Sequence, residues 1–363
     1  MILYDPSIIV NYLDYGIMLP IPPDRGNRVL EFLNGAYTVL ATRSAKIILG
    51  CEKQVFNRED LERVHSKDYI ANLYGDGLQA ALLSTFELID ANGNPFRYEP
   101  DRAVKPLSDL FNSLTAQAEG TYLESRLALS HGFCFYLGGG MHHARYDKGS
   151  GFCLINDAAA AAIKILSERT RSCPSGVSLV WIIDLDAHKG DGTAELISFA
   201  RERGELRAPC EKSANAISPN NKPCILTLSI HMAKGWPLDE ESLLSAKKDR
   251  APLLPSDVDI GIDTGEEAEY TSRLADGIRK LESLSGRMPD FAVVVDGADP
   301  YEHDALPSSS LLRLTLDQCI ERDTYVYRCL KERKIPSAWI QSGGYGERAW
   351  EPPAHFLKSI KQI

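Results

Sequence analysis

The chain has 363 residues, of which 44% are hydrophobic and 25% are charged, a composition typical of an ordinary globular protein. This balance excludes a disordered chain, a fibrous protein and a small disulfide-stapled scaffold. Forty Lys and Arg against fifty Asp and Glu give a formal charge of -10. We expect no direct nucleic-acid partner, because an acidic surface repels phosphate backbones.

The cysteines and the first residues bear on the compartment. None of the eight Cys forms a C-x-x-C pair, which argues against a Cys-based zinc ribbon or a thioredoxin-type site. The opening residues, MILYDPSIIVNYLDYG, lack the cationic segment of a secretory signal. No apolar stretch approaches the roughly 20 residues that a membrane-spanning helix needs. The sequence therefore predicts a cytoplasmic protein without a membrane partner.

Short apolar runs alternate with longer segments of helical pattern along the chain. In chain order, the expected elements are helices over 25–40 and 107–129, a strand over 134–137, a helix over 156–167, a strand over 178–184, a helix over 192–203, a strand over 224–230, a helix over 267–284, a strand over 291–296, a helix over 311–331 and a strand over 337–341. Ser309 or Ser310 is expected to cap the last helix. Because most strands read as continuous apolar runs, we expect a parallel sheet buried on both faces. The alternation predicts an α/β fold with helices on both faces of a mostly parallel central sheet.

One polar segment interrupts this pattern. Residues 201–222, RERGELRAPCEKSANAISPNNK, are rich in Asn, Ser and Pro and separate a predicted helix from the strand at 224. We interpret the segment as a surface insertion, and a rim loop that shapes substrate access is the alternative. A linker between domains is disfavoured, because the apolar strands on both sides belong to the same expected sheet.

Acidic residues and a histidine follow the strand over 178–184. Asp184, Asp186 and His188 are spaced two apart, so in an extended chain their side chains point to the same side. Ionisable groups gathered at a buried strand end are costly unless they bind a cation or one another. The oxygen and nitrogen ligands of an Asp-x-His pattern suit a divalent metal such as Zn²⁺. The alternative is a hydrogen-bonded Asp–His pair that caps the following helix.

A second acidic cluster follows the strand over 291–296, in the stretch DGADPYEHD. Asp299 would supply a third metal ligand, since the carboxyl ends of parallel strands meet at one edge of a sheet. Three protein ligands with an open position are typical of a catalytic rather than a structural zinc site. In the alternative interpretation, Asp296 and Asp299 only cap a turn.

Two adjacent histidines follow a run of glycines in the stretch LGGGMHHAR. Consecutive glycines permit unusual backbone angles and the close approach of other groups. With Asp184 and Asp191 available, His142 and His143 would form two His–Asp dyads, in which each carboxylate fixes an imidazole tautomer. Such a pair can take a proton from water and return one to a leaving amine.

The last predicted strand runs into the stretch QSGGYG. A tyrosine between glycines can turn its hydroxyl toward a carbonyl group and stabilise the oxyanion that forms there. Tyr345 is therefore a candidate catalytic residue. Taken alone, the stretch fits a turn with a packed tyrosine better, and it gains weight only from the other three motifs.

Taken together and in this order, the motifs GGGMHHA, SGFCLINDAA, IIDLDAHKGDG, LSIH, DGADPYEHD and SGGYG resemble the histone deacetylase superfamily, which includes acetylpolyamine amidohydrolases. The resemblance extends from Tyr4 to beyond Tyr345. It implies an arginase/deacetylase-like α/β fold. It also implies one catalytic domain over 1–363, since residues from 142 to 345 must meet at a single metal ion.

The resemblance implies roles for individual residues. The zinc ligands would be Asp186, His188 and Asp299. The residues of the catalytic machinery would be His142 backed by Asp184, His143 backed by Asp191, and Tyr345, which would polarise the carbonyl. A structural potassium ion beside the zinc strand would take oxygen ligands, several of them backbone carbonyls, from Asp184, Asp186, His188, Ser229 and Ile230. Arg25 matches an arginine in an internal channel near the floor of the family's site.

The acyl-lysine tunnel of the family can be placed in part. Gly151 and Phe152, in the stretch SGFCLIND, match its lining, with Phe152 as one aromatic wall. No Phe occurs where the second wall is expected, and Trp236 or Leu238 would replace it. By its spacing from the third zinc ligand, Leu306 lies near the tunnel mouth.

Some residues depart from the family pattern. Lys189 stands where a second His usually follows the ligand His, and we expect little effect on the chemistry because it points off the metal face. Ser342 replaces a Gly before the tyrosine loop. The rim aspartate that grips the backbone of a lysine substrate has two candidates, Asp90 and Asp101.

The leading hypothesis is zinc-dependent hydrolysis of the amide in acylated primary amines. The expected substrate is N-ε-acetyl-lysine of peptides or proteins, and acetate is released. Within the class, the alternative is an acetylpolyamine amidohydrolase, for which Glu302 near the mouth would supply a carboxylate and Leu306 would not.

A binuclear manganese ureohydrolase needs a second Asp where this chain has Gly190. A non-catalytic zinc-binding or ligand-binding scaffold would lack part of the site, and no part is missing here. The acyl-chain preference, the choice of a monomer or an oligomer, and the choice of zinc over iron or cobalt do not follow from the sequence.

Overall fold

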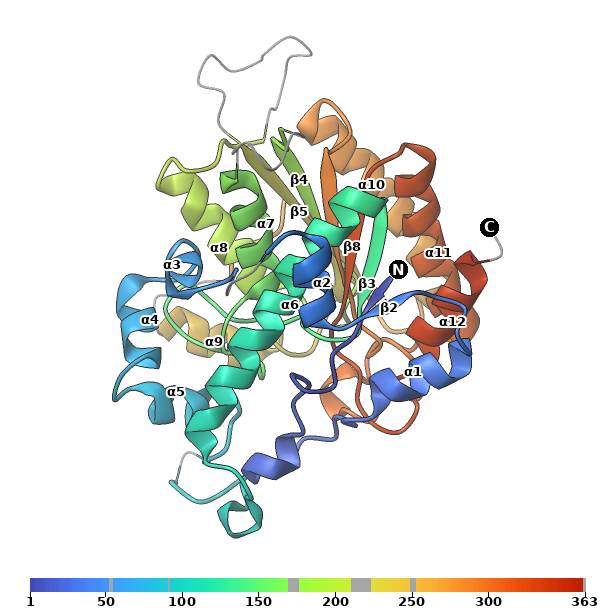
Figure 1. The fold of residues 1–363 in the computed structure, drawn as a ribbon. Coiled ribbons are helices and arrows are strands. Elements are labelled where there is room, and N and C mark those ends of the chain that lie inside the picture. The colour runs from blue at the N-terminus through green and yellow to red at the C-terminus, as the bar shows by residue number, and fades with distance from the viewer. Residues whose placement is uncertain (52–54, 91, 169–175, 210–222, 249–252, 362–363) are drawn as a thin grey trace.

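The computed structural model describes residues 1–51, 55–90, 92–168, 176–209, 223–248 and 253–361, and its centre is one sheet (Figure 1). Neighbouring strands follow the order β2-β1-β3-β8-β7-β4-β5-β6, and every pairing is parallel. The strands are β1 (Ile2–Leu3), β2 (Val39–Leu40), β3 (Phe133–Tyr136), β4 (Leu179–Asp184), β5 (Cys224–Met232), β6 (Val258–Ile262), β7 (Phe291–Asp296) and β8 (Ser337–Gln341). The predicted parallel sheet is confirmed.

The central strands are buried along their whole length. Every residue of β4, β5, β7 and β8 is buried, which explains why these strands read as continuous apolar runs. Successive residues of β4 alternate between two cores: Val180 and Ile182 pack on one face, and Trp181 and Ile183 pack on the other.

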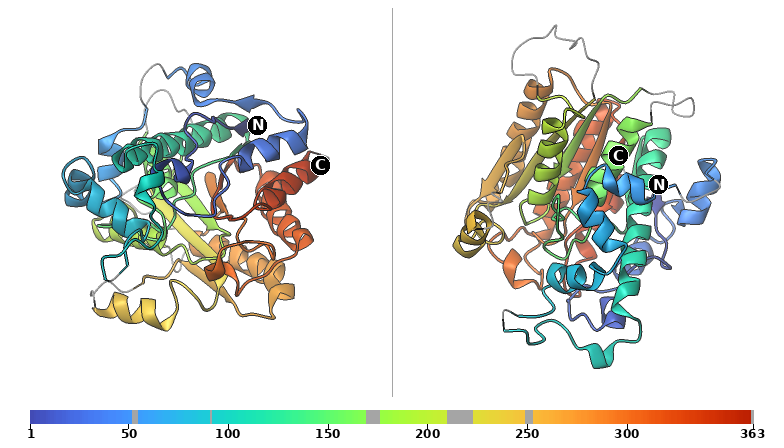
Figure 2. Two further views of the ribbon diagram at one scale, coloured as in Figure 1. Left: turned by 90° about the horizontal axis from the view of Figure 1, so that it is seen from below. Right: turned by 90° about the vertical axis from the view of Figure 1, so that its left-hand side faces the viewer.

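Helices form a layer on each face of the sheet (Figure 2). One core lies between the sheet and α6 (Leu110–His131), α7 (Asp157–Ser167) and α8 (Asp191–Glu202). The other lies between the sheet and α1 (Arg25–Leu33), α10 (Tyr270–Ser285), α11 (Leu316–Glu332) and α12 (Glu351–Ile360). The remaining helices are α2 (Thr42–Ile48), α3 (Arg58–Glu62), α4 (Lys67–Leu73), α5 (Leu78–Thr85) and α9 (Glu240–Lys248). The predicted helices on both faces are therefore confirmed.

The helix predicted over 25–40 is too long. Asn34 adopts a left-handed conformation (φ 44°), so α1 ends at Leu33 and the chain then forms β2. The sequence pattern also missed the three outer strands. β1 and β2 have only two residues each, and β6 carries Asp259 and Gly261 at the open edge of the sheet.

The predicted cap of the last helix is wrong. α11 begins at Leu316, where a capping box closes its first turn. The Thr315 hydroxyl accepts a hydrogen bond from the backbone N–H of Gln318, and the Gln318 side-chain oxygen accepts one from the backbone N–H of Thr315. Ser309 and Ser310 lie several residues earlier, in and just after a separate 3-10 turn. The Thr-x-x-Gln spacing is a stronger helix start than the serines, because it satisfies two backbone donors at once.

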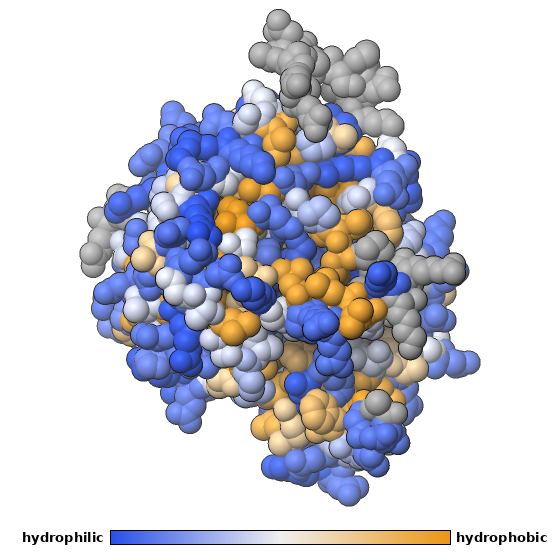
Figure 3. Space-filling model, turned by 180° about the vertical axis from the view of Figure 1, so that it is seen from behind, coloured by the Kyte–Doolittle hydropathy of each residue, from blue (hydrophilic) through white to orange (hydrophobic). Residues whose placement is uncertain are grey.

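The predicted polar insertion over 201–222 begins at the end of α8 and continues through 203–209, and its remainder, 210–222, lies outside the described residues. None of the helices in the described part of the chain has the length and apolarity needed to cross a bilayer. On the face that Figure 3 shows, apolar side chains gather in patches within a mostly hydrophilic surface.

Candidate active site

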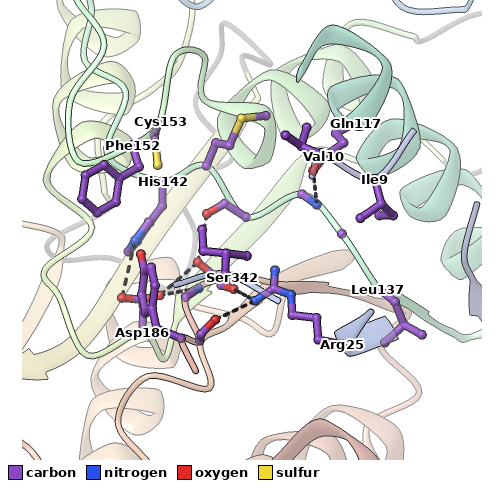
Figure 4. Close-up of a pocket in the computed structure, with 18 of the residues that line it drawn as sticks. Ile9, Val10, Arg25, Gln117, Leu137, His142, Phe152, Cys153, Asp186 and Ser342 are labelled. Carbon is purple, nitrogen blue, oxygen red and sulfur yellow. Dashed lines mark hydrogen bonds and ion pairs between the residues drawn. The ribbon is translucent and has the colours of Figure 1, made fainter. Parts of the chain in front are cut away.

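The candidate site lies at the carboxyl edge of the sheet. β3, β4, β7 and β8 all end there, because parallel strands bring their carboxyl ends to the same edge. The loops after β3, β4 and β8 line one cavity of about 90 Å³, and Asp299, in the loop after β7, lies next to the lining residues Asp186 and His188. Figure 4 shows part of it, with His142, Asp186 and Ser342 from three different loops lying close together. His142 and Ser342, which are 200 positions apart in the chain, thus line one cavity.

Asp186, His188 and Asp299 form the candidate metal group. His188 Nδ1 lies 2.9 Å from an oxygen of Asp299 and 3.3 Å from an oxygen of Asp186. One ligand atom from each residue lies within 4.8 Å of the others, and all three side chains are buried. His142, His143 and Asp186 form a second group with the same spacing, which shares one carboxylate with the first. Oxygen and nitrogen donors arranged in this way fit a divalent ion such as zinc.

Glycines keep the space around this group open. A Cβ atom at Gly297 would come within 2.7 Å of oxygens of both Asp186 and Asp299, and one at Gly343 would come within 2.6 Å of oxygens of the same two residues. Any larger residue at either position would therefore push into the carboxylates. The backbone N–H of Gly343 also donates a hydrogen bond to Asp186 (2.9 Å). The residues present form a cradle for a small cation.

The buried charge of this group favours a cation. Burial and, to a smaller extent, the neighbouring Asp186 carboxylate raise the pKa of Asp299 to about 7, against the opposing effect of His188. Burial alone would lower the pKa of His188, but hydrogen bonds to Asp186 and Asp299 and their negative charge raise it to about 10. Two carboxylates held together in a buried site thus need a positive partner, and a divalent ion supplies one without a proton.

A buried arginine that the sequence analysis missed ties both ligand-bearing turns to α11. Arg322 donates to the carbonyl oxygens of Leu185 (2.9 Å) and Gly297 (3.0 Å), which lie next to or near the candidate ligands in the chain. It also pairs with Asp296 (2.8 Å) and Asp323 (2.6 Å), and its side chain is fully buried. The available signal was the adjacent Arg and Asp on the apolar face of a helix.

Two histidines stand side by side above the candidate metal group. Nδ1 of His142 lies 2.7 Å from Asp184, and Nδ1 of His143 lies 2.8 Å from Asp191. The two ring centroids are 3.8 Å apart. The structure therefore brings together both of the expected dyads, and both histidines line the cavity.

The two dyads differ in their electrostatics. Burial alone would lower the pKa of His142, but the charges of Asp184 and Asp186 raise it to about 9. Burial and, to a smaller extent, the charge of the neighbouring His142 lower the pKa of His143 to about 4, against the opposing effect of Asp191. Environments that push two neighbouring pKa values apart are typical of paired acid and base groups.

The start of α7 holds the loop that carries these histidines. The carboxylate of Asp157 accepts hydrogen bonds from the backbone N–H groups of Gly140 (2.9 Å) and Met141 (2.7 Å). The amide of Asn156 donates to the backbone carbonyl of His142 (3.0 Å). Both residues belong to the SGFCLINDAA motif, which had been connected only with the tunnel. Their role depends on contacts between distant segments, so no spacing rule reveals it.

Tyr345 is buried beside the candidate metal group, and its loop is held from two sides. Asp304 accepts a hydrogen bond from the backbone N–H of Tyr345 (2.7 Å). The guanidinium of Arg25 donates to the carbonyl oxygens of Ser342 (3.0 Å) and Gly344 (3.3 Å), as Figure 4 shows in part. Burial and the charges of nearby carboxylates raise the pKa of the Tyr345 hydroxyl well above its ordinary value, so the hydroxyl remains a hydrogen-bond donor.

The expected substrate-binding residues lie at different distances from this centre. Gly151 and Phe152 line the cavity. The ring of Trp236 contacts that of His143, with centroids 4.6 Å apart, and Gly151 packs against both. Leu306 is buried, and its backbone N–H donates to Asp304 in the turn that also holds Tyr345.

Three expectations remain: the position of Lys189, the rim aspartate, and the residues expected around a potassium ion. Lys189 pairs with Asp259 of β6, away from the candidate metal group. Asp90 accepts backbone hydrogen bonds from within its own turn, and neither it nor Asp101 is among the described residues that line the cavity. The five residues expected around potassium lie together at the ends of β4 and β5, where Asp184 pairs in register with Ser229.

Comparison with known proteins places the chain. The family described as Histone deacetylase domain matches residues 19–355, which is most of the sequence. The chain belongs to the histone deacetylase family. Histone deacetylase 2 of Arabidopsis thaliana is 24% identical over 345 residues, covering 95% of this chain and 74% of that relative. An uncharacterised protein of Picosynechococcus sp. is 29% identical over 229 residues, covering 63% of this chain and 61% of that protein. The predicted family is thus confirmed, although this last match spans less than two thirds of the relative.

The fold of this histone deacetylase family member recurs in a solved structure. Acetylpolyamine aminohydrolase from Burkholderia pseudomallei has a TM-score of 0.62 with this chain, at 17% sequence identity. The match covers 98% of this chain and 97% of that one. The predicted deacetylase-like fold is therefore confirmed across nearly the whole chain.

Proposed function

We propose that this protein is a zinc-dependent amide hydrolase that acts on acylated primary amines. The proposed substrate is N-ε-acetyl-lysine of peptides or proteins, and the products are acetate and the free amine. The observation that carries this proposal is that Asp186, His188, His142, His143 and Tyr345 line one cavity. Asp299 lies next to Asp186 and His188, and Asp184 and Asp191 hold the two histidines from the other side. Family membership supports the same reaction class.

Asp186, His188 and Asp299 would hold the zinc ion. When bound, zinc supplies Lewis acidity toward a carbonyl group and toward water. His142 and His143 line the same cavity as Asp186 and His188, and Nε2 of His142 lies 3.6 Å from an oxygen of Asp186. A substrate carbonyl entering the cavity would therefore lie between this group and the histidine pair.

His143 is the proposed proton carrier. Asp191 holds Nδ1, so Nε2 is directed to the cavity and can take a proton from an attacking water. The same nitrogen can then give that proton to the departing amine, which prevents its return to the acyl carbon. Asp184 orients His142 in the same way, and the position of His142 beside Asp186 suits it to stabilise negative charge.

Tyr345 is the proposed donor to the substrate carbonyl. Its hydroxyl is protonated and buried, so a hydrogen bond to a developing oxyanion competes with little water. The backbone contacts to Asp304 and Arg25 fix the loop before the substrate arrives. This preorganisation means that no reorientation is required as charge develops.

The tunnel to this centre would be formed by Gly151, Phe152, Trp236 and Leu306. Aromatic and aliphatic walls suit the methylene chain of a lysine side chain, and they offer no carboxylate for a polyamine. We also propose that residues 1–363 act as one catalytic domain. A structural potassium ion would be bound by oxygen atoms near the ends of β4 and β5.

The test combines a substrate panel with one substitution. Wild-type protein should hold one zinc ion and release acetate from acetyl-lysine peptides faster than from acetylpolyamines, and the reverse order would assign the acetylpolyamine reaction. Tyr345→Phe should retain zinc while kcat falls by about 100-fold. Tyr37→Phe, which removes a hydroxyl bonded to the distant Leu357 carbonyl, is the matched control and should leave kcat unchanged. Undiminished turnover in Tyr345→Phe would remove the tyrosine from the mechanism, and tightly bound zinc without hydrolysis of any acyl-amine would support a scaffold instead.

A further inference from the structure

Three consecutive serines precede α11, and each has a different partner. They lie in and just after the 3-10 turn η5 (Pro307–Ser309). Ser309 Oγ donates to the carboxylate of Asp304 (2.9 Å), and Ser310 Oγ donates to the carbonyl of Pro307 (2.7 Å). Ser308 Oγ instead lies 3.2 Å from Nε2 of His188. Only the first of the three serines therefore contacts a candidate metal ligand.

The orientation of His188 gives this contact its meaning. Nδ1 of the ring faces the carboxylates of Asp299 (2.9 Å) and Asp186 (3.3 Å), where the metal ion would lie. A neutral imidazole that offers the Nδ1 lone pair to a metal must carry its proton on Nε2. Among the described residues, the Ser308 hydroxyl is the group placed to accept that proton as a hydrogen bond.

We propose that Ser308 is a positioning residue for the metal site. By accepting a hydrogen bond from Nε2 of His188, it holds the ring in the tautomer and the rotation that present Nδ1 to the metal ion. The inference rests on the proposed zinc site, and it adds a residue outside the ligand set that determines how tightly the ion is held. Partners of this kind on ligand histidines typically change metal affinity by 10- to 100-fold.

The turn that carries Ser308 is itself held in place. The Asp304 carboxylate accepts hydrogen bonds from the Leu306 backbone (2.8 Å) and from Ser309 Oγ (2.9 Å), which fix both ends of the short segment between them. The same carboxylate accepts the backbone N–H of Tyr345 (2.7 Å). One short turn therefore connects the orientation of a candidate ligand with the position of the proposed carbonyl donor. The Ser308 hydroxyl is held next to His188 by its backbone, although the residue as a whole is exposed.

The neighbouring serines offer a matched experiment. Ser308→Ala, Ser308→Thr and Ser310→Ala are prepared in the full chain, and the zinc dissociation constant of each is measured by competition with a chromogenic chelator at one fixed pH. We expect Ser308→Ala to weaken zinc binding by about 10-fold. Ser308→Thr keeps a hydroxyl and should bind as the wild type does, and Ser310→Ala should change the constant by less than about 2-fold.

The outcomes separate this inference from the proposed function. Equal zinc affinities for Ser308→Ala and Ser310→Ala, in a wild-type protein that binds zinc and hydrolyses acyl-amines, would overturn the role of Ser308 alone. A wild-type protein that binds no zinc would overturn both. A ring ¹⁵N spectrum of His188 gives a readout independent of activity: zinc-loaded wild type should carry its proton on Nε2. In the zinc-loaded protein that Nε2–H proton should exchange with water faster in Ser308→Ala than in the wild type and slowly again in Ser308→Thr, because only the hydroxyl accepts its hydrogen bond. An unchanged exchange rate in Ser308→Ala would contradict the role of Ser308.

Discussion

The buried arginine behind the site gives a sharp test of how the ligand-bearing turns are held. Arg322 donates four hydrogen bonds, two to the carboxylates of Asp296 and Asp323 and two to the carbonyls of Leu185 and Gly297. Its side chain is fully buried, and the paired carboxylates are also buried. Arg322→Met removes the charge and all four donors but preserves most of the side-chain volume.

The size of the effect follows from what the substitution leaves behind. Removing one partner of a buried ion pair typically costs about 3 to 5 kcal/mol, because the other charge stays buried. Two buried carbonyls that lose their donors add roughly 1 kcal/mol each, the lower end of the cost of an unsatisfied buried group. We therefore expect the free energy of unfolding to fall by about 5 to 7 kcal/mol, a large share of the roughly 5 to 15 kcal/mol that is ordinary for a folded domain.

Equilibrium unfolding in urea measures this loss, with zinc removed so that metal binding does not contribute. Arg328→Met, an exposed arginine on the same helix, is the control and should change the free energy of unfolding by less than about 0.5 kcal/mol. Arg322→Lys keeps a charge without the planar fork and should lose about 2 kcal/mol, which leaves a folded protein for zinc measurements. Its zinc affinity should fall, because Leu185 and Gly297 lie within two residues of candidate ligands. If Arg322→Met were no less stable than Arg328→Met, the hydrogen bonds of Arg322 would not hold the ligand-bearing turns.

Two further predictions concern other groups around the site. His65 is buried between the Arg145 carbonyl and the Asn156 backbone N–H, and burial lowers its pKa from 6.5 to about 4. The unfolded chain therefore binds this proton at a higher pH than the native protein does, so stability present above pH 6.5 is lost as the pH falls toward 4. The loss is about 3 kcal/mol, and urea unfolding across this range should show a flatter profile for His65→Gln, whereas parallel profiles would assign the slope to other groups. Asp304→Ala frees the backbone of Tyr345 and should lower kcat about 10-fold with little change in KM. In the Tyr345→Phe background the same change should alter kcat less than about 2-fold, and fully additive losses would show that Asp304 does not act through the tyrosine.

The sheet was predictable wherever its strands are buried on both sides. β4, β5, β7 and β8 are mostly apolar, because helices cover both of their faces and a buried polar residue is costly unless it is hydrogen-bonded. β1 and β2 are too short to carry a pattern, and β6 lies at an edge where polar residues are tolerated. The end of α1 was missed because Asn34 stops the helix by its backbone conformation, which no periodicity records.

The candidate site was predictable where its residues directly follow a strand. Asp186, His188 and Asp299 come just after β4 and β7, so parallel pairing alone brings them to one edge. Arg322, Asp157 and Ser308 were not found. Each acts by a contact with a segment more than 15 residues away, and each belongs to a helix or turn whose local pattern is complete without that role.

The sequence by itself determined the strand ends, and with them the chemistry that is available at one edge of the sheet. Buried carboxylates and imidazoles in such a place need a cation or one another, whatever the surrounding fold. The tertiary structure decided which atoms of those residues point toward the candidate metal position and which atoms form hydrogen bonds to neighbouring segments. Hydrogen bonds have a direction and a short range, so the tautomer of His188 and the position of Tyr345 depend on Ser308 and Asp304, which only folding brings within 3.2 Å of them.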